Sequence, residues 1–256
     1  MRLRPVSRRR VELVISLDPL ASYIALYRVV STVLKARVLA AGGAELHASA
    51  VGGHGRIVAF VGPKGAGKTS LCMDFVLSQR AAFVANDHIL LLPGDPVGVV
   101  SLPETLRIGQ GTISQHKVLR SLAARTGRGF GSDGKTRIHV SEIAPLLNDR
   151  PVFSGPLAAI VTCAFDNAAQ GGVLERVSGP SATVSDALTG MAKHVRPAWI
   201  EGLDACAVRR SGVAALSLDR VPTFRLRRAK GDTYAPLRLA RSLRSVLDAD
   251  LTGEPI

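Results

Sequence analysis

Short apolar runs rich in Val, Ile, Phe and Ala alternate along the chain with longer stretches in which apolar residues recur at helical spacing. Residues 20–39 and 68–78 carry the helical pattern. The short runs are typical of buried strands, and the clearest are residues 46–51, 56–61, 83–85 and 157–162. This alternation predicts an α/β fold with a mixed central sheet flanked by helices.

Further strands are expected where alternating or β-branched runs are bounded by turn residues. Residues 89–92 and 97–102 flank a Pro-Gly-Asp turn and predict a β-hairpin. The glycine-rich stretch at residues 127–135 has no strand or helix pattern and is expected to be a mobile loop. Other strands are expected at residues 11–15, 136–140, 174–177, 213–218 and 223–226.

Capping residues indicate three more helices. Ser141 with Glu142 can open one of them. Ser185 can cap a second helix that runs to about His194, and Pro236 can open a last one because proline suits the first helical position. These helices would cover the faces of the sheet.

The chain shows no internal repeat and no low-complexity linker. We expect residues 1–45 to form a basic segment whose strand and helix pack on one catalytic domain, residues 46–256. No targeting or membrane-spanning segment is expected, and a cytoplasmic location is the simplest interpretation. Four charged residues interrupt the apolar runs of the N-terminal part, namely Glu12, Asp18, Arg28 and Lys35.

The composition narrows the function classes. Only 4% of the residues are aromatic and the formal net charge is +13, so the core depends on aliphatic side chains and the partners are expected to be anionic. Three scattered Cys residues give neither a zinc pattern nor a disulfide framework. Few aromatics and no helix-turn-helix signal make nucleic acid an unfavoured partner.

One motif carries the clearest chemistry. The pattern G-x-x-x-x-G-K-[ST] lies between a predicted strand and a predicted helix, which is the context of a phosphate-binding P-loop. Lys68 would reach the β- and γ-phosphates of ATP, and the Thr69 hydroxyl would bind Mg²⁺. The nucleotide-binding residues are expected to be Gly62, Pro63, Lys64, Gly65, Ala66, Gly67, Lys68, Thr69 and Ser70.

A P-loop needs a carboxylate to complete a metal shell or to accept a proton. Asp87 follows the predicted strand at residues 83–85 and is the best candidate. An Asp at the end of a strand can equally form a turn, so its position alone leaves both interpretations open.

The order of three segments resembles the catalytic domain of the HPr kinase/phosphorylase family, which is related to phosphoenolpyruvate carboxykinase in fold. A strand with His47 at its start precedes the P-loop, and the later strand ends in Asn86-Asp87. The segment from Glu104 to Gly109 looks like a loose form of the family's E-x-R-G-x-G signature. The specific part of the resemblance covers roughly residues 45–110.

The resemblance implies roles for individual residues. His47 would belong to the active site, Lys68 would hold the phosphates, and Asp87 would be the general base. Thr69 and Glu104 would bind Mg²⁺. The sequence departs from the family in three places, because Asn86 replaces an Asp, Thr69 replaces Ser and Lys64 replaces a small residue. HPr itself is therefore not implied as the substrate.

The expected function is that of an ATP-dependent serine-type kinase acting on an acidic protein or peptide, and a homo-oligomer is compatible with it. One alternative is a kinase for a small molecule. Another is a nucleotide-gated regulator or nucleic-acid-binding module in which the P-loop acts as a switch.

Overall fold

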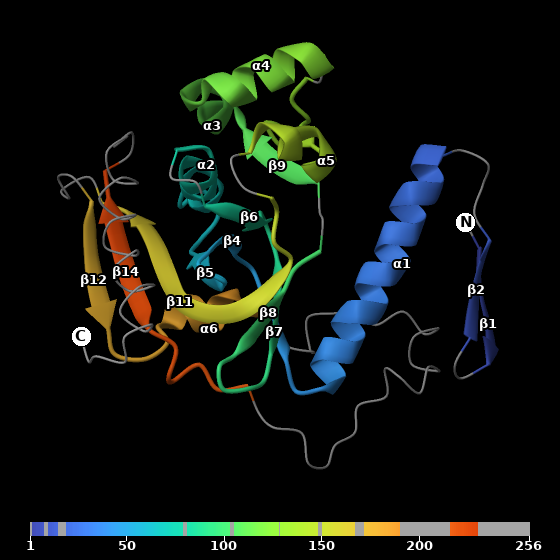
Figure 1. The fold of residues 1–256 in the computed structure, drawn as a ribbon, viewed down its shortest axis with the longest axis horizontal. Coiled ribbons are helices and arrows are strands. Elements are labelled where there is room, and N and C mark those ends of the chain that lie inside the picture. The colour runs from blue at the N-terminus through green and yellow to red at the C-terminus, as the bar shows by residue number, and fades with distance from the viewer. Residues whose placement is uncertain are drawn as a thin grey trace.

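The computed structural model describes residues 2–7, 10–14, 19–78, 81–102, 105–127, 129–147, 150–166, 172–189 and 216–229. The elements in chain order are β1 Arg2–Ser7, β2 Arg10–Val14, α1 Pro19–Ala40, β3 Ala44–Leu46, β4 Ser49–Gly53, β5 Arg56–Val61, α2 Lys68–Ser78, β6 Ala82–Ala85, β7 Ile89–Leu92, β8 Gly98–Val100, β9 Leu106–Gly109, α3 Gln110–Gln115, α4 Lys117–Thr126, β10 Lys135–Ile138, α5 Val140–Ile143, η1 Ala144–Leu146, β11 Ser154–Phe165, β12 Val173–Val177, α6 Ala182–Ala187, β13 Leu188–Thr189 and β14 Thr223–Arg228. Figure 1 shows them as a mixed α/β arrangement.

Ten of the strands in these described ranges form one curved sheet. One path runs β13-β3-β7-β8-β11-β5-β4-β6, and β14 pairs with both β11 and β12. The long strand β11 joins the two halves of the sheet. Its first residues pair antiparallel with β8, whereas the following residues pair parallel with β5 and with β14. The predicted mixed sheet is therefore confirmed.

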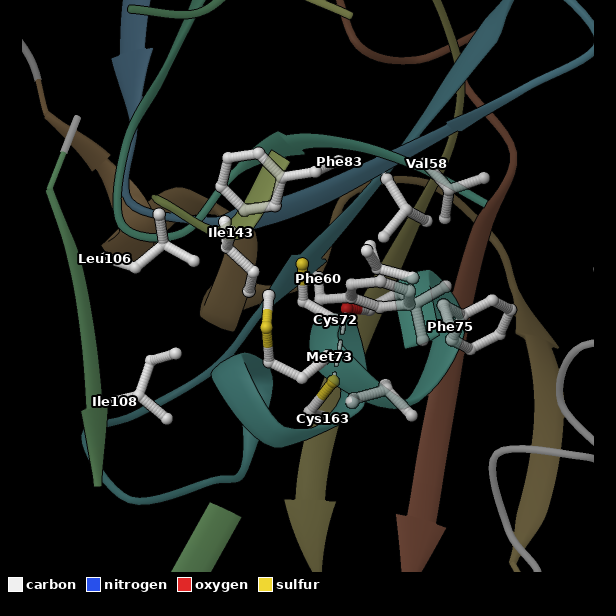
Figure 2. Close-up of a cluster of buried hydrophobic side chains, with 14 of the residues drawn as sticks. Val58, Phe60, Cys72, Met73, Phe75, Phe83, Leu106, Ile108, Ile143 and Cys163 are labelled. Atoms are coloured by element: carbon white, nitrogen blue, oxygen red, sulfur yellow. Dashed lines mark hydrogen bonds between the residues drawn. The ribbon is translucent and has the colours of Figure 1, made fainter. Parts of the chain in front are cut away.

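Buried aliphatic and aromatic side chains fill both faces of this sheet. On one face, α2 presents Leu71, Cys72, Phe75 and Val76 at helical spacing, and all four are buried. Figure 2 shows this cluster, in which the rings of Phe60 and Phe75 lie 5.5 Å apart. Each such side chain contributes about 1.5–3 kcal/mol by leaving water. Packing on the sheet thus fixes the position of α2.

The N-terminal elements lie at the edge of the structure (Figure 1). β1 and β2 form a separate antiparallel pair, and α1 lies against β3 and β7. None of the helices within the described ranges combines the length and the apolar character that crossing a membrane requires.

Several sequence predictions are confirmed, including the strand at 56–61, the helix at 68–78 and the hairpin of β7 and β8. The single strand predicted at residues 46–51 is wrong. The chain there forms β3 and β4, which pair with different neighbours. Apolar and polar residues alternate through residues 46–50 across the break, so periodicity could not reveal it.

The helix predicted from Ser185 to about His194 is also wrong in its bounds. Ser181 occupies the N-cap position, α6 ends at Ala187, and β13 follows directly. Residues 216–218 are described and do not form a strand. The helix predicted from Pro236 lies outside the described residues.

Candidate active site

A cavity of about 520 Å³ opens above the start of α2. It joins segments that are far apart in the sequence. Residues 64–70 form its floor, and the surrounding side chains come from the turn after β6, from β9, from α3 and from the loop before β10. The remaining lining residues are His47, Asp87, Arg107, Gly109, Thr112, Asp133 and Lys135.

The glycine-rich loop, residues 62–67, leads from the end of β5 into the first turn of α2. Gly62, Gly65 and Gly67 all have positive φ angles, of +154°, +86° and +82°. A Cβ atom at Gly67 would lie 2.2 Å from Nη2 of Arg228, which would have to shift, and the positive φ would itself strain any other residue there. The glycines thus allow a compact loop whose backbone faces the cavity at the positive end of the helix.

Lys68 is the first residue of α2 and is only 8% exposed. Its Nζ donates hydrogen bonds to the carbonyl oxygens of Gly62, at 2.7 Å, and Pro63, at 3.3 Å. Burial lowers the pKa of Lys68, and the nearby Lys135 acts in the same direction. The ammonium group is therefore held inside the loop, where an anion entering the loop would meet it.

Two hydroxyl residues follow Lys68 at the start of α2. Thr69 lines the cavity, and Ser70 forms a hydroxyl–hydroxyl hydrogen bond of 2.6 Å with Thr112 of α3. This contact fixes α3 against the first turn of α2. Because Ser70 bonds to Thr112, Thr69 is the better placed of the two hydroxyls to contact a ligand bound in the loop.

Asp87 lines the same cavity as the glycine-rich loop. It follows β6, whose end is held in place because the buried Ser49 hydroxyl donates to the Asn86 carbonyl at 2.5 Å. Arg107 of β9 places Nη1 4.0 Å from Oδ2 of Asp87 and also contacts the carboxylate of Asp133. One cation therefore lies between two carboxylates at the rim of the site.

His47 occupies the break between β3 and β4. Its backbone N–H donates to the Ala187 carbonyl at 2.9 Å, and the N–H of Ala48 donates to the Asp87 carbonyl at 3.0 Å. These bonds fasten the break to the turn that carries Asp87. Burial lowers the pKa of His47, and the neighbouring Lys68 and His88 lower it further. The imidazole is consequently neutral at neutral pH.

A titration of His47 checks this electrostatic arrangement. We expect its midpoint, followed by NMR, to lie below 6.5 in the folded protein and near 6.5 in urea. Because the folded state disfavours the protonated ring, His47 makes the free energy of unfolding fall as pH decreases below 6.5. A midpoint at or above 6.5 in the folded chain would show that Asp87 dominates its surroundings.

The buried carboxylate of Glu45 in β3 contacts Lys35 of α1 and His88, the residue after Asp87. The Glu45 side chain is 1% exposed, and its Oε1 lies 2.6 Å from Lys35 Nζ and 3.1 Å from His88 Nδ1. Burial alone would raise the pKa of Glu45, but hydrogen bonds from His88 and Lys35 outweigh it and lower the pKa to about 2. The rings of His88 and His47 lie 5.0 Å apart, so this ion cluster supports the wall of the cavity.

Replacing Glu45 with Gln is expected to lower the free energy of unfolding at pH 7 by about 2–3 kcal/mol, because Lys35 and His88 lose their buried carboxylate partner. The lowered pKa means that wild type loses this contribution as pH falls from 4.5 toward 2, whereas the variant does not. Urea unfolding at several pH values measures both effects. Glu175→Gln, at an exposed pair with Arg227, is the control and should cost less than about 1 kcal/mol. Equal effects of the two variants would contradict a special role for Glu45.

The donor set suits Mg²⁺ together with phosphate. Thr69 and Asp87 bring a hydroxyl and a carboxylate to one cavity, and Mg²⁺ prefers such oxygens. The described residues contain no cluster of three or more His, Cys, Asp or Glu side chains arranged for a metal ion.

No protein-family model and no curated protein matches this sequence. Among solved structures, the chain is similar to the Hpr(Ser) kinase/phosphatase from Coxiella burnetii, with 10% sequence identity and a TM-score of 0.39. The match covers 82% of this chain and 99% of that chain. It is a distant structural likeness, and at this TM-score it adds no argument about activity.

The structure brings together most of the residues that the sequence analysis assigned to a site. His47, Asp87 and the loop around Lys68 line the same cavity, whereas Glu104 lies outside the described residues. Four further lining residues were not predicted as site residues. Arg107 lies within the E-x-R-G-x-G-like segment, and Asp133 lies in the loop that was expected to be mobile. The missed residues are Arg107, Thr112, Asp133 and Lys135.

Proposed function

We propose that this chain is an ATP-dependent phosphotransferase that moves the γ-phosphoryl group to a serine-type hydroxyl of an acidic protein or peptide. The observation that carries the proposal is that Lys68, at the start of α2, and Asp87 line the same cavity. Phosphoryl transfer requires a cation at the phosphates and an acceptor for the hydroxyl proton. Lys68 and Asp87 would supply these two groups to one substrate in the cavity.

The glycine-rich loop would hold the β- and γ-phosphates. Lys68 exchanges its hydrogen bonds to the Gly62 and Pro63 carbonyls for phosphate oxygens, which it approaches from inside the loop. The N–H groups at the start of α2 have no acceptor one turn earlier in the helix and add partial positive charge. A bound Mg²⁺ would supply further neutralisation of the phosphates, and the Thr69 hydroxyl would hold it together with phosphate oxygens and water.

The acceptor hydroxyl would approach from the side of β6 and β9. Asp87 accepts its proton while the attacking oxygen bonds to the γ-phosphorus and the bond to the β-phosphate oxygen breaks. Arg107 is placed to steady Asp87 and to attract an anionic substrate. His47, whose lowered pKa favours the neutral ring and whose neighbour Ala48 donates to the Asp87 carbonyl, completes the wall without adding charge.

The charge of the chain supports an acidic acceptor. Its formal net charge of +13 raises the local concentration of anionic peptides by attraction over roughly a Debye length. An acidic segment with a Ser would therefore meet the cavity more often than a neutral one.

A phosphorylation screen tests the proposal. Acidic peptides with one Ser are incubated with the protein and MgATP, and phosphoserine is sought as a phosphate mass shift. We expect modification of acidic peptides and none of the same peptides with Ser changed to Ala. ATP consumption that modifies only a small metabolite would replace the proposed acceptor class, and tight ATP binding without any transfer would favour a nucleotide-gated regulator.

A further inference from the structure

The other side of the glycine-rich loop carries an exposed aromatic ring. Phe165 ends β11 and is 40% exposed, while Arg228 ends the adjacent strand β14 and is 5% exposed. The guanidinium carbon of Arg228 lies 5.3 Å from the centre of the Phe165 ring, within the range of a cation–π contact. Among the exposed Phe side chains of the described residues, which also include Phe130 and Phe153, Phe165 is the one that contacts an Arg beside the glycine-rich loop.

The ring adjoins the loop directly. Nη2 of Arg228 donates to the Gly67 carbonyl at 3.1 Å, so one guanidinium contacts both the loop and the ring. A Cβ atom built on Gly67 would lie 3.1 Å from Cζ of Phe165. The ring edge therefore stands against the residue that precedes Lys68.

The strand order separates this ring from the proposed acceptor side. β5, which leads into the loop, is flanked by β11 and then β14 on one side and by β4 and then β6 on the other. Asp87 follows β6, whereas Phe165 and Arg228 end β11 and β14. In Figure 1 these two strands lie on one side of α2, and β9, which carries Arg107, lies on the other.

A nucleoside triphosphate has two ends, and the site gives them different surroundings. If the γ-phosphate faces Asp87, the phosphate chain runs across the start of α2 and the nucleoside leaves on the side of β11. Phe165 offers an uncharged flat surface on that side, next to Gly67. Bases stack on such rings irrespective of sequence because every base has a π-face.

We propose that Phe165, backed by Arg228, is the stacking platform for the base of the bound nucleotide. This inference rests on the proposed function, because it takes the phosphates to lie in the glycine-rich loop. Arg228 is a positioning residue, since it holds the ring on one side and the Gly67 carbonyl on the other. The base would bind on the exposed part of the ring.

Calorimetric titration with two ligands tests the platform. MgATP reports the base and the phosphates together, whereas magnesium tripolyphosphate reports the loop alone. Phe165→Leu keeps apolar volume but removes the π-face, and Phe165→Trp restores it. Phe153→Ala is the matched control, because Phe153 is 36% exposed and lies just before the opposite end of β11.

We expect Phe165→Leu to weaken MgATP binding by roughly 5- to 100-fold, the effect of losing one base–aromatic stack, while tripolyphosphate binding stays unchanged. Phe165→Trp should keep the wild-type affinity for ATP, and Phe153→Ala should change neither ligand. Unchanged ATP affinity in Phe165→Leu would overturn the platform while leaving the phosphate site intact. An equal loss of both ligands would assign Phe165 to loop structure instead. Failure of wild type to bind tripolyphosphate would overturn the phosphate site together with the platform.

Discussion

Replacing Asp87 with Asn is expected to lower kcat for phosphoryl transfer by about 10²–10⁴, the usual contribution of a general base. The amide keeps the shape of the side chain but cannot accept the hydroxyl proton. Nucleotide affinity should stay within a few-fold, because Lys68 and the loop backbone hold the phosphates. Initial rates with an acceptor peptide that wild type phosphorylates measure kcat, and an ATP titration measures nucleotide affinity.

Two variants serve as controls for Asp87. Asp133 also lines the cavity and contacts Arg107, so Asp133→Asn tests whether removing any carboxylate has the same effect. We expect it to change kcat far less, as we do for Asn86→Asp. Near wild-type turnover in Asp87→Asn would place the base elsewhere. Loss of ATP binding in that variant would make Asp87 mainly a metal ligand or a structural residue.

The second large effect is expected for Lys68→Ala. A ligand that binds only the folded state stabilises it by RT ln(1 + [L]/Kd), or about 2.7 kcal/mol at a hundredfold excess over Kd. Lys68 is the buried cation inside the loop, so Lys68→Ala should remove most of the stabilisation that MgATP gives to wild type. Thermal unfolding with and without MgATP measures the difference.

Lys117→Ala is the matched control, because Lys117 begins α4 and does not line the cavity. It should keep the full stabilisation by MgATP. If Lys68→Ala is stabilised as much as wild type, the nucleotide binds at another surface of the protein. A loss in both variants would point to general charge attraction.

The central part of the fold follows from local signals. Residues 56–61 are a β-branched run that ends at Gly62, and α2 has its buried residues at helical spacing, so periodicity defines both elements. The break at His47 and Ala48 has no such signal. It depends on backbone hydrogen bonds to Ala187 and Asp87, which are remote in the sequence.

The same distinction between local signals and remote contacts applies to the site. The residues that belong to a contiguous motif, such as Lys68 and Thr69, could be assigned from spacing alone. Arg107 and Asp133 approach the cavity only because β9 pairs with β10, and the sequence does not reveal that pairing. The cluster of Glu45 with Lys35 and His88 likewise depends on α1 packing against β3, which no local pattern predicts.

Calorimetric titration of the wild-type protein with ATP, ADP and AMP, each with Mg²⁺, tests the central claim most directly. The cavity at the glycine-rich loop is proposed to hold the β- and γ-phosphates, and Lys68 is placed to bind them. Affinity should therefore fall stepwise as phosphates are removed, and AMP should bind only weakly. Equal affinity for all three nucleotides, or no binding of ATP at millimolar concentration, would contradict the account.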